Sequence, residues 1–462
     1  MSVPKTTTTP WHDPLEKAVR LLPADPDALL FHEERENARI EVDGRDPFAR
    51  ISLSRIRGAA ARDGAGKIHH RSNPSPEDLA ALAAGLHDGG GPPLQSGPRL
   101  ADSGDYATRL PETERVARAL VQASTRIRTL GAGVIADLSI DWVAFVQRIW
   151  VAPASGLARQ DVRRGCRMRV TAGANGWPRG VTVAVDRVVK PDTLPSVDGR
   201  IEPLVGSLVE PLIEPMIQRL RQRLTARRAP AGNHPIVFAP GTGGVVLHEL
   251  VGHALEADTV ARGGSLLAGT RGTVSSELVT VIDDPRRGRA AWRVDDDGCD
   301  STPVALMREG RVTGLMHDER SARGKKRSST GHGRCSSYSA AVRPRMGCTF
   351  LAAGPHDPRE VIESTRAGVY IRRMESAGTD PAIGVAHFRV TDADRIEGGR
   401  LDAPLEPFVL RVTVADGLAS IDCVADDVEF DTCIGSCVRD GQTLATSVGA
   451  PTYRLGVATI NS

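Results

Sequence analysis

Two histidines and a glutamate lie within one short, mostly apolar segment, His248-Glu249-Leu250-Val251-Gly252-His253. Imidazole nitrogens are common zinc ligands, and a carboxylate beside them can take a proton from a water molecule that the ion polarises. These residue types therefore indicate a metal-assisted hydrolase. The alternative is that both histidines are ordinary polar positions on a helix.

The spacing of the two histidines is unusual. The common zinc-protease helix places its histidines four residues apart, whereas His248 and His253 are five residues apart. At roughly 100° per residue, five residues separate two side chains by about 140° around a regular α-helix. One ion could hardly be shared at that angle, so we expect a π-bulge or a similar distortion between them, a feature often found at functional sites.

Composition excludes several classes of protein. The chain has 462 residues, a formal net charge of only +2 and seven scattered cysteines. Its length allows two or three domains, and its charge gives no general attraction to nucleic acid or anionic lipid. No apolar run approaches a membrane span and no secretory signal opens the chain, so we expect a cytoplasmic protein without a membrane partner. An odd, scattered set of cysteines does not indicate a disulfide framework.

Apolar and turn patterns predict the elements that position these residues. In the first half we expect helices at 74–86, 111–129 and 201–228, and strands at 28–32, 37–43, 133–138, 142–151 and 167–172. A strand at 234–239 and a glycine-rich turn at 240–244 precede the helix that carries both histidines. Further strands are expected at 279–282, 311–316, 368–371, 386–390, 408–414 and 419–424. The turn lacks the Lys-Ser/Thr pair of a phosphate-binding loop, so it predicts a tight strand-to-helix connection.

Helices and strands are segregated more than they alternate, which favours an α+β fold. We expect a disordered tail at 1–13 and a mixed α/β N-terminal domain at 14–230, with a linker at about 88–105. A β-rich C-terminal domain at 231–462 would follow, with the histidine helix at the junction of the two domains.

The segment from Pro240 to Asp258 resembles the signature of the TldD/PmbA family of metallopeptidases. The catalytic subunit of that family carries a glycine-rich turn, then His-Glu-x-x-Gly-His, then Leu-Glu-x-Asp. Similar family motifs continue to the end of the chain, at 275–284, Arg334, Ser337-Tyr338, Pro344-Arg345-Met346, Cys437 to Gln442 and 449–452. The resemblance thus covers the second half of the chain, with looser agreement in the first half.

The resemblance implies a zinc site. Carried over by position, the zinc ligands are His248, His253 and Cys437, and Glu249 is the general base that later protonates the leaving amine. A thiolate is a suitable third ligand, and three protein ligands leave a fourth position open. Cys433 and Cys423 are rival third ligands, although each also fits a small buried apolar position.

Several further residues are candidates on the periphery of this site. Glu256 could accept a hydrogen bond from the free ring nitrogen of a ligand histidine, or it could be a plain surface carboxylate or salt-bridge partner, and the same holds for Asp258. The resemblance places Arg334 and Tyr338 in a substrate-side loop. His332, in a Gly- and Ser-rich loop that follows the basic residues at 323–327, could hydrogen-bond a substrate or stabilise an oxyanion. Cys348 stands where the family pattern has asparagine, and Pro285 to Gly288 replaces a short glycine turn. These departures put the substrate preference of the family in doubt.

Three functions compete at this point. The first is a zinc-dependent peptidase that cleaves unfolded or flexible peptides. The resemblance implies that such a peptidase is the catalytic subunit of a pair, with a metal-less homologous subunit (TldE/PmbA-like) as its partner in a heterodimer or higher assembly. The second is a zinc-dependent amide hydrolase acting on a small natural-product intermediate or thiol conjugate. The third is a catalytically silent scaffold, against which the complete ligand set argues.

Overall fold

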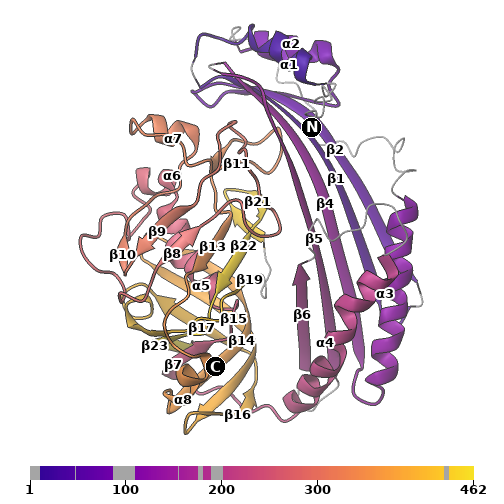
Figure 1. The fold of residues 1–462 in the computed structure, drawn as a ribbon, viewed down its shortest axis with the longest axis vertical. Helices are drawn as coiled ribbons and strands as arrows, with labels where there is room; N and C mark the ends of the chain where they lie inside the picture. The colour runs from indigo at the N-terminus through magenta and orange to yellow at the C-terminus, as the bar shows by residue number, and fades with distance from the viewer. Residues whose placement is uncertain are drawn as a thin grey trace, which may run out of the picture.

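The computed structural model describes residues 11–461 except 26, 47, 87–109, 155, 175–180, 189–200 and 431–435. It confirms the α+β class, because long antiparallel strands and separate helices make up the N-terminal half and shorter strands surround the histidine helix in the C-terminal half (Figure 1). The expected linker at 88–105 lies outside the described residues. A helix begins at His12, so the expectation of a disordered tail reaching residue 13 is wrong at its last positions, where Trp11 stacks on His32.

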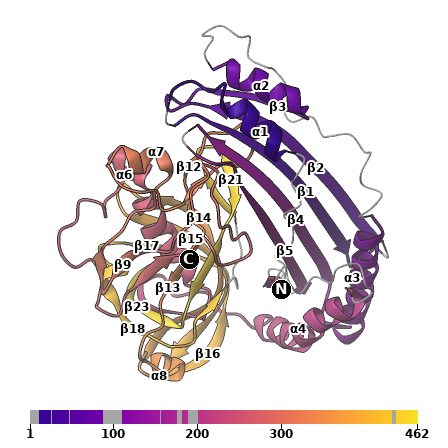
Figure 2. The same ribbon diagram turned by 45° about the horizontal axis from the view of Figure 1, so that its top comes forward.

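The N-terminal half is built on one antiparallel sheet of six strands in the order β3-β2-β1-β4-β5-β6. Helices α1 and α2 cover one end of this sheet, and α3 and α4 lie at the other end (Figures 1 and 2). The strands are β1 (Leu29–Asp43), β2 (Ala49–Arg62), β3 (Ile68–Ser72), β4 (Asp137–Pro153), β5 (Arg159–Ala174) and β6 (Val181–Val188). The helices are α1 (His12–Val19), α2 (Pro76–Ala84), α3 (Leu110–Leu130) and α4 (Ile201–Arg223).

Two pairs of expected strands are each one long strand. The expected strands 28–32 and 37–43 join in β1, and 133–138 and 142–151 join in β4, which begins at Asp137. The polar run at 33–36 interrupts the apolar pattern of β1 without interrupting its backbone pairing with β2 and β4. Buried Glu33 in this run accepts a hydrogen bond from Gln147 of β4 and forms an ion pair with Arg35. A neighbour on β1 and a partner on β4 therefore stabilise the buried charge of Glu33, although the polar residues alone suggest that the strand ends there.

The C-terminal half contains two larger sheets. In the first, the order β14-β7-β23-β17-β15 closes into a ring through β14–β15 pairing, with β16 and β18 attached at β15 and β23. Its strands are β7 (Gly232–Phe238), β14 (Ala367–Asp380), β15 (Val385–Glu397), β16 (Arg400–Leu405), β17 (Phe408–Thr413), β18 (Ile421–Val424) and β23 (Tyr453–Asn461). The second sheet has the order β10-β9-β8-β13-β22-β19. Its strands are β8 (Val281–Asp283), β9 (Val304–Arg308), β10 (Arg311–Val312), β13 (Cys348–Leu351), β19 (Glu429–Phe430) and β22 (Ser447–Ala450).

Short elements complete this half. Two hairpin-like pairs stand apart from the large sheets: β11 (Gly333–Arg334) with β12 (Arg343–Pro344), and β20 (Ser436–Arg439) with β21 (Gln442–Ala445). The histidine segment comprises α5 (Gly244–Leu247), the π-helix η3 (His248–Gly252), the 3-10 turn η4 (His253–Leu255) and α6 (Ala257–Ala261). The remaining helices are α7 (Glu319–Arg323), α8 (Pro358–Glu363) and the 3-10 turn η5 (Leu418–Ser420).

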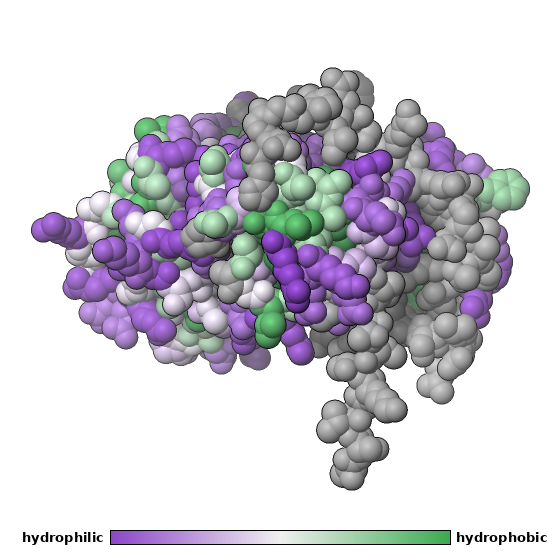
Figure 3. Space-filling view, turned by 90° about the horizontal axis from the view of Figure 1, so that it is seen from above, coloured by the Kyte–Doolittle hydropathy of each residue, from purple (hydrophilic) through white to green (hydrophobic). Residues whose placement is uncertain are grey.

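The histidine segment runs through the main core of the C-terminal half. Its apolar residues, from Val246 to Leu255, are packed with the closed ring of strands and with Met316 and Met346. The N-terminal sheet has its own core against α3 and α4. Seen from above, most of the coloured surface is hydrophilic, with only small hydrophobic areas (Figure 3). Over the residues that the structure describes, no helix combines the length and apolarity needed to cross a membrane.

Candidate metal centre

The helix that carries the two histidines contains the distortion that their spacing predicts. Residues His248–Gly252 form a single π-helical turn, in which the backbone N–H of His253 donates to the carbonyl oxygen of His248. This i→i+5 hydrogen bond adds one residue to the turn. Two side chains five positions apart therefore return to the same face, and the π-bulge prediction is confirmed.

Glycines at the start of this helix let it approach two strands closely. Gly241 adopts φ +78° and its N–H donates to Ala450 of β22. A Cβ on Gly243 would lie 2.1 Å from the ring of Tyr453, and one on Gly244 would lie 2.7 Å from the backbone nitrogen of Gly449. The tight strand-to-helix turn expected here is thus confirmed, and its glycines are required by packing against the strands.

A fourth glycine, Gly252, lies within the π-helical turn itself. A Cβ on Gly252 would lie 2.0 Å from the sulfur of Met346, whose side chain is buried in the core. Gly252 therefore makes room for the loop that follows β12. The same loop brings Arg345 to the histidine cluster.

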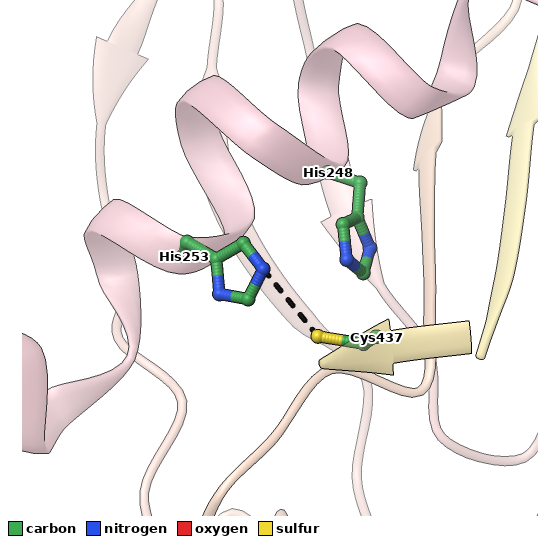
Figure 4. A group of neighbouring side chains, drawn as sticks. All are labelled: His248, His253 and Cys437. Carbon is green, nitrogen blue, oxygen red and sulfur yellow. Dashed lines mark hydrogen bonds between the residues drawn. The ribbon is translucent and has the colours of Figure 1, made fainter. Parts of the chain in front are cut away.

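His248, His253 and Cys437 come together in one buried cluster (Figure 4). One potential ligand atom from each lies within 4.8 Å of the others. The Sγ atom of Cys437 is 3.4 Å from Nε2 of His253, and the two imidazole centroids are 5.0 Å apart with nearly perpendicular planes. Cys437 comes from β20, 184 residues after His253. Among the described residues, this is the one group of three His, Cys, Asp or Glu side chains close enough to hold an ion.

The electrostatics of the cluster suit a cation. Burial lowers the pKa of His248 well below its usual value, so its ring is neutral, as a metal ligand requires. Its Nδ1 atom is buried without a hydrogen-bond partner. Burial also opposes protonation of His253, but the neighbouring Cys437 sulfur and Glu256 carboxylate raise its pKa well above the usual value. The same negative groups that favour a proton on His253 would favour a metal cation in its place.

Glu249 lies beside the cluster on the π-helical turn. Its Oε2 atom is 3.8 Å from Nε2 of His253, and the side chain is 9% exposed. Burial raises the pKa of Glu249, an effect that the charge of His253 and a hydrogen bond with Ser376 partly offset. The arrangement thus combines three ligand atoms with a carboxylate next to them.

Comparison with known proteins identifies the C-terminal half. The family model for the PmbA/TldA metallopeptidase C-terminal domain matches residues 231–462. The chain belongs to this family. It is 35% identical over 239 residues to the metalloprotease TldD homolog of Haemophilus influenzae, covering 51% of this chain and 50% of the relative. The zinc metalloprotease TldD homolog of Saccharolobus solfataricus is 26% identical over 224 residues, or 48% of this chain and 50% of the relative. The chain therefore matches about half the length of these curated relatives.

The likeness in fold extends further than the likeness in sequence. The crystal structure of TldE from Thermococcus kodakarensis superposes with a TM-score of 0.74 at 15% identity, covering 97% of this chain and 99% of TldE. Both halves of the chain thus share the fold of TldE.

Outside the cluster, a carboxylate and two arginines orient the potential ligands. Nδ1 of His253 is 3.2 Å from Oε2 of Glu256, the hydrogen bond expected of Glu256 at a histidine ligand. Arg439 donates to the same Glu256 oxygen at 2.5 Å, and it binds both carboxylate oxygens of Asp258 at 3.0 and 2.8 Å. Arg345 is 1% exposed, and its Nη2 atom lies 3.1 Å from the sulfur of Cys437. In this member of the PmbA/TldA family, Asp258 therefore contacts Arg439 and reaches His253 only through Glu256.

The sequence did not single out Arg345 and Arg439 as site residues. Arg439 follows Cys437 by two positions on β20, so both side chains lie on the same face of that strand. Two carboxylates close after the histidine motif would need cationic partners if buried, which is the one sequence signal for Arg439. Arg345 belongs to the family motif Pro344-Arg345-Met346, but the resemblance does not assign it to the metal ligands.

The structure does not bring His332, Arg334 or Tyr338 into the cluster. His332 is fully buried, with Nε2 3.2 Å from Asp283 and Nδ1 2.9 Å from Thr330. Arg334 contacts Asp296 and lies over the ring of Trp292. Tyr338 packs against the N-terminal sheet, where its hydroxyl is 2.7 Å from Ser72. The partners of all three are thus groups outside the metal centre.

The other cysteines in question lie elsewhere. Cys423 is on β18, where it packs with Val237 and Tyr370, and Cys433 lies outside the described residues. Cys348 is fully buried in β13, where it pairs with Ser447. This departure from the family pattern is therefore a core position and gives no support to an altered substrate groove.

Proposed function

We propose that this chain is a zinc-dependent metallopeptidase that hydrolyses amide bonds in unfolded or flexible peptides. The observation that carries the proposal is the buried cluster of His248, His253 and Cys437 with Glu249 beside it. Two imidazoles and a thiol are a donor set that suits zinc, and the orphaned Nδ1 atom of His248 fits a site built to hold an ion. The name of the Saccharolobus solfataricus relative, a zinc metalloprotease, supports the same ion.

Zinc held by His248, His253 and Cys437 would leave one position open and supply Lewis-acid activation of water and the scissile carbonyl. Glu249 then accepts a proton from the attacking water and donates it to the leaving amine nitrogen. Glu256 and Arg439 hold the ring of His253 in one tautomer and one orientation. Arg345 donates to the sulfur of Cys437, so it stabilises the thiolate that binds zinc.

Glu249→Gln tests the chemistry while keeping the shape of the side chain. We expect this variant to retain zinc and lose roughly 10²–10⁴-fold in the rate of hydrolysis of an unstructured peptide, the usual contribution of general acid–base catalysis. Glu277→Gln changes an exposed glutamate in a loop and is the matched control, which should keep the full rate. An unchanged rate in Glu249→Gln would rule out its role as the base.

Zinc content tests the ligand set separately. Cys437→Ser should lose most of the bound zinc in elemental analysis of the purified protein, and Cys423→Ser, a buried cysteine outside the cluster, should retain it. Equal zinc content in the two variants would remove Cys437 from the ligand set. A wild-type protein without zinc or another transition metal would overturn the proposal as a whole.

We also propose that the chain is the catalytic TldD-type subunit of a pair whose other subunit is a metal-less, TldE/PmbA-like homologue. The likeness in fold to TldE supports a partner of the same architecture, because homologous chains can pair through equivalent surfaces. Co-expression with a homologue that lacks the His-Glu motif, followed by size-exclusion chromatography, tests this. A stable complex with higher peptidase activity is expected, and separate elution with full activity in the chain alone would refute it.

A further inference from the structure

A cavity lies between the two halves of the chain, lined by none of the residues of the metal cluster. Its volume is about 210 Å³, many times the roughly 15 Å³ that one water molecule needs. One wall comes from the ends of β1, β2 and β3, and the other comes from the loop at 297–299 and from α7. Figures 1 and 2 show α7 near the end of the sheet that α1 and α2 cover. The cavity therefore joins elements that are far apart in the sequence.

Arg62 supplies an incompletely paired cation in the N-terminal wall. It is 5% exposed, and its Nη2 atom donates to the carbonyl oxygen of Tyr338 at 3.1 Å and to the sulfur of Cys335 at 3.3 Å. Its Nε and Nη1 atoms are buried and have no hydrogen-bond partner. An unsatisfied buried guanidinium is unfavourable, and a carboxylate is the group that best satisfies a fork of N–H donors. Arg62 thus brings a positive charge to the lining of the cavity, and this charge favours an anionic group there.

The opposite wall carries two carboxylates. Asp297 accepts from the backbone of Glu319, and Asp318 caps α7 by accepting from Ser321, so each carboxylate keeps further acceptor positions. Burial, together with the neighbouring Asp295 and Asp318, raises the pKa of Asp297 well above its usual value, while the charge of Arg62 acts in the opposite direction. Within the described residues, Arg62 and Asp297 form no direct ion pair although both line the cavity. A ligand between them could neutralise both walls.

The acidic wall is not a metal site. Among the described residues, the histidine–cysteine cluster is the one group with metal-ligand spacing. An ammonium group needs fewer ligand atoms than a metal ion, and it can donate up to three hydrogen bonds to such carboxylates. Leu29, Ile68 and Val342 add an apolar part to the lining. The lining thus combines cationic, anionic and apolar groups around a small volume.

We propose that this cavity is a binding site for a small zwitterion of the α-amino-acid class. Its carboxylate binds Arg62, its ammonium group lies against Asp297 and Asp318, and a small apolar side chain packs on Leu29 and Val342. The site is separate from the metal centre and does not depend on the peptidase function. Because its walls belong to both halves, the bound ligand stabilises their association.

Isothermal titration calorimetry on the full chain tests the proposal with glycine, L-alanine and L-leucine as probes at up to about 10 mM. We expect at least one of them to bind at a single site. The single-charge analogues propionate and ethylamine should bind roughly tenfold or more weakly, because each lacks one charge-assisted contact. No saturable binding of any amino acid would overturn the proposal, and so would equal binding of either analogue.

Variants locate the site. Arg62→Gln and Asp297→Asn should each weaken binding by roughly tenfold or more, whereas Arg57→Gln, on the same strand but not in the lining, should not. Asp297→Asn keeps the size of the side chain, so it gives an answer even if Arg62→Gln does not fold. Cys437→Ser should bind the amino acid normally, because Cys437 does not line the cavity. An amino acid that instead chelates the metal would lose its site in that variant. Binding that is lost only in Cys437→Ser, or unchanged in Asp297→Asn, would refute the cavity as the site.

Discussion

Replacing Gly244 with alanine tests whether the close approach of α5 to β22 holds the helical segment with His248 and His253 in place. The added Cβ would lie 2.7, 2.8 and 2.9 Å from the backbone nitrogen, oxygen and carbon of Gly449. Real Cβ atoms essentially never come closer than 3.0 Å to another atom. The obstructing atoms belong to β22, which pairs with both β13 and β19, so no side-chain rotation can relieve the contact. Either the strand or the start of the helix must move.

The expected free-energy change follows from two opposing effects. Alanine gains up to about 1 kcal/mol over glycine in a helix, and an overpacked core contact costs about 1–3 kcal/mol. The net effect is a destabilisation of about 1–2 kcal/mol, or roughly 2–8 °C in the Tm of a unit of this size. A displaced helix would also move His248 and His253 relative to Cys437, so zinc content should fall together with Tm.

Gly269→Ala is the matched control, because a Cβ at Gly269 would meet no atom within 4 Å and its φ is not in the left-handed region. It lies in the same half of the chain and should raise stability by about 0.4–1 kcal/mol through the unfolded state. Thermal unfolding and elemental analysis of both variants decide the question. If Gly244→Ala kept the zinc content and matched or exceeded the wild-type Tm, the close approach of α5 to β22 would not constrain the helical segment with the two histidines.

Three further variants or measurements test other parts of the structure. Arg163→Ala removes the guanidinium 2.6 Å from the carboxylate of Asp296, where both side chains are fully buried. The free energy of unfolding, measured by denaturant titration, should fall by about 3–5 kcal/mol in this variant, but by about 1 kcal/mol or less in Arg159→Ala, which removes an exposed ion pair. Equal losses in the two variants would contradict the burial argument. Burial lowers the pKa of His32 to about 3 from its ordinary 6.5, so below pH 6.5 the unfolded chain takes up a proton that the folded chain does not, and stability should fall by about 2 kcal/mol between pH 7 and pH 5. The variant His32→Phe should lack this part of the pH dependence, and an identical slope would show that His32 does not cause it. Zinc should slow hydrogen exchange at the backbone amide of Leu444, which lies on the same hairpin as Cys437. Exchange that is equally fast with and without zinc would show that the hairpin is docked independently of the ion.

The sequence predicted best what depends on neighbours along the chain. The helix expected at 74–86 forms as α2 (Pro76–Ala84), where Ser75 and Asp78 make a capping box. The five-residue spacing of the histidines predicted the π-helical turn, because the number of residues per turn alone decides whether two side chains share a face. Both predictions rest on local geometry, so tertiary structure was not needed to make them.

Longer-range features were predicted less well. The polar residues at 33–36 hid the continuity of β1, because their partners lie on β4 more than a hundred positions later. Arg345 and Arg439 were missed for the same reason, because their partners at the site, Cys437 and Glu256, are far from them in the sequence. Periodicity carries no information about such partners, whereas the family resemblance supplied Cys437 by position.

The position of Cys437 also shows why the metal centre is a feature of the tertiary structure. Within the part of the chain that the structure describes, strand β20 pairs only with β21, and an isolated two-stranded hairpin is at best marginally stable in water. Its contacts with the rest of the chain include those of Arg345 with Cys437, of Glu256 and Asp258 with Arg439, and of Ser336 with Gln442. Three of these contacts involve a potential metal ligand or a residue that orients one. Ion binding and docking of the hairpin are therefore coupled, and a change that weakens either one weakens the other.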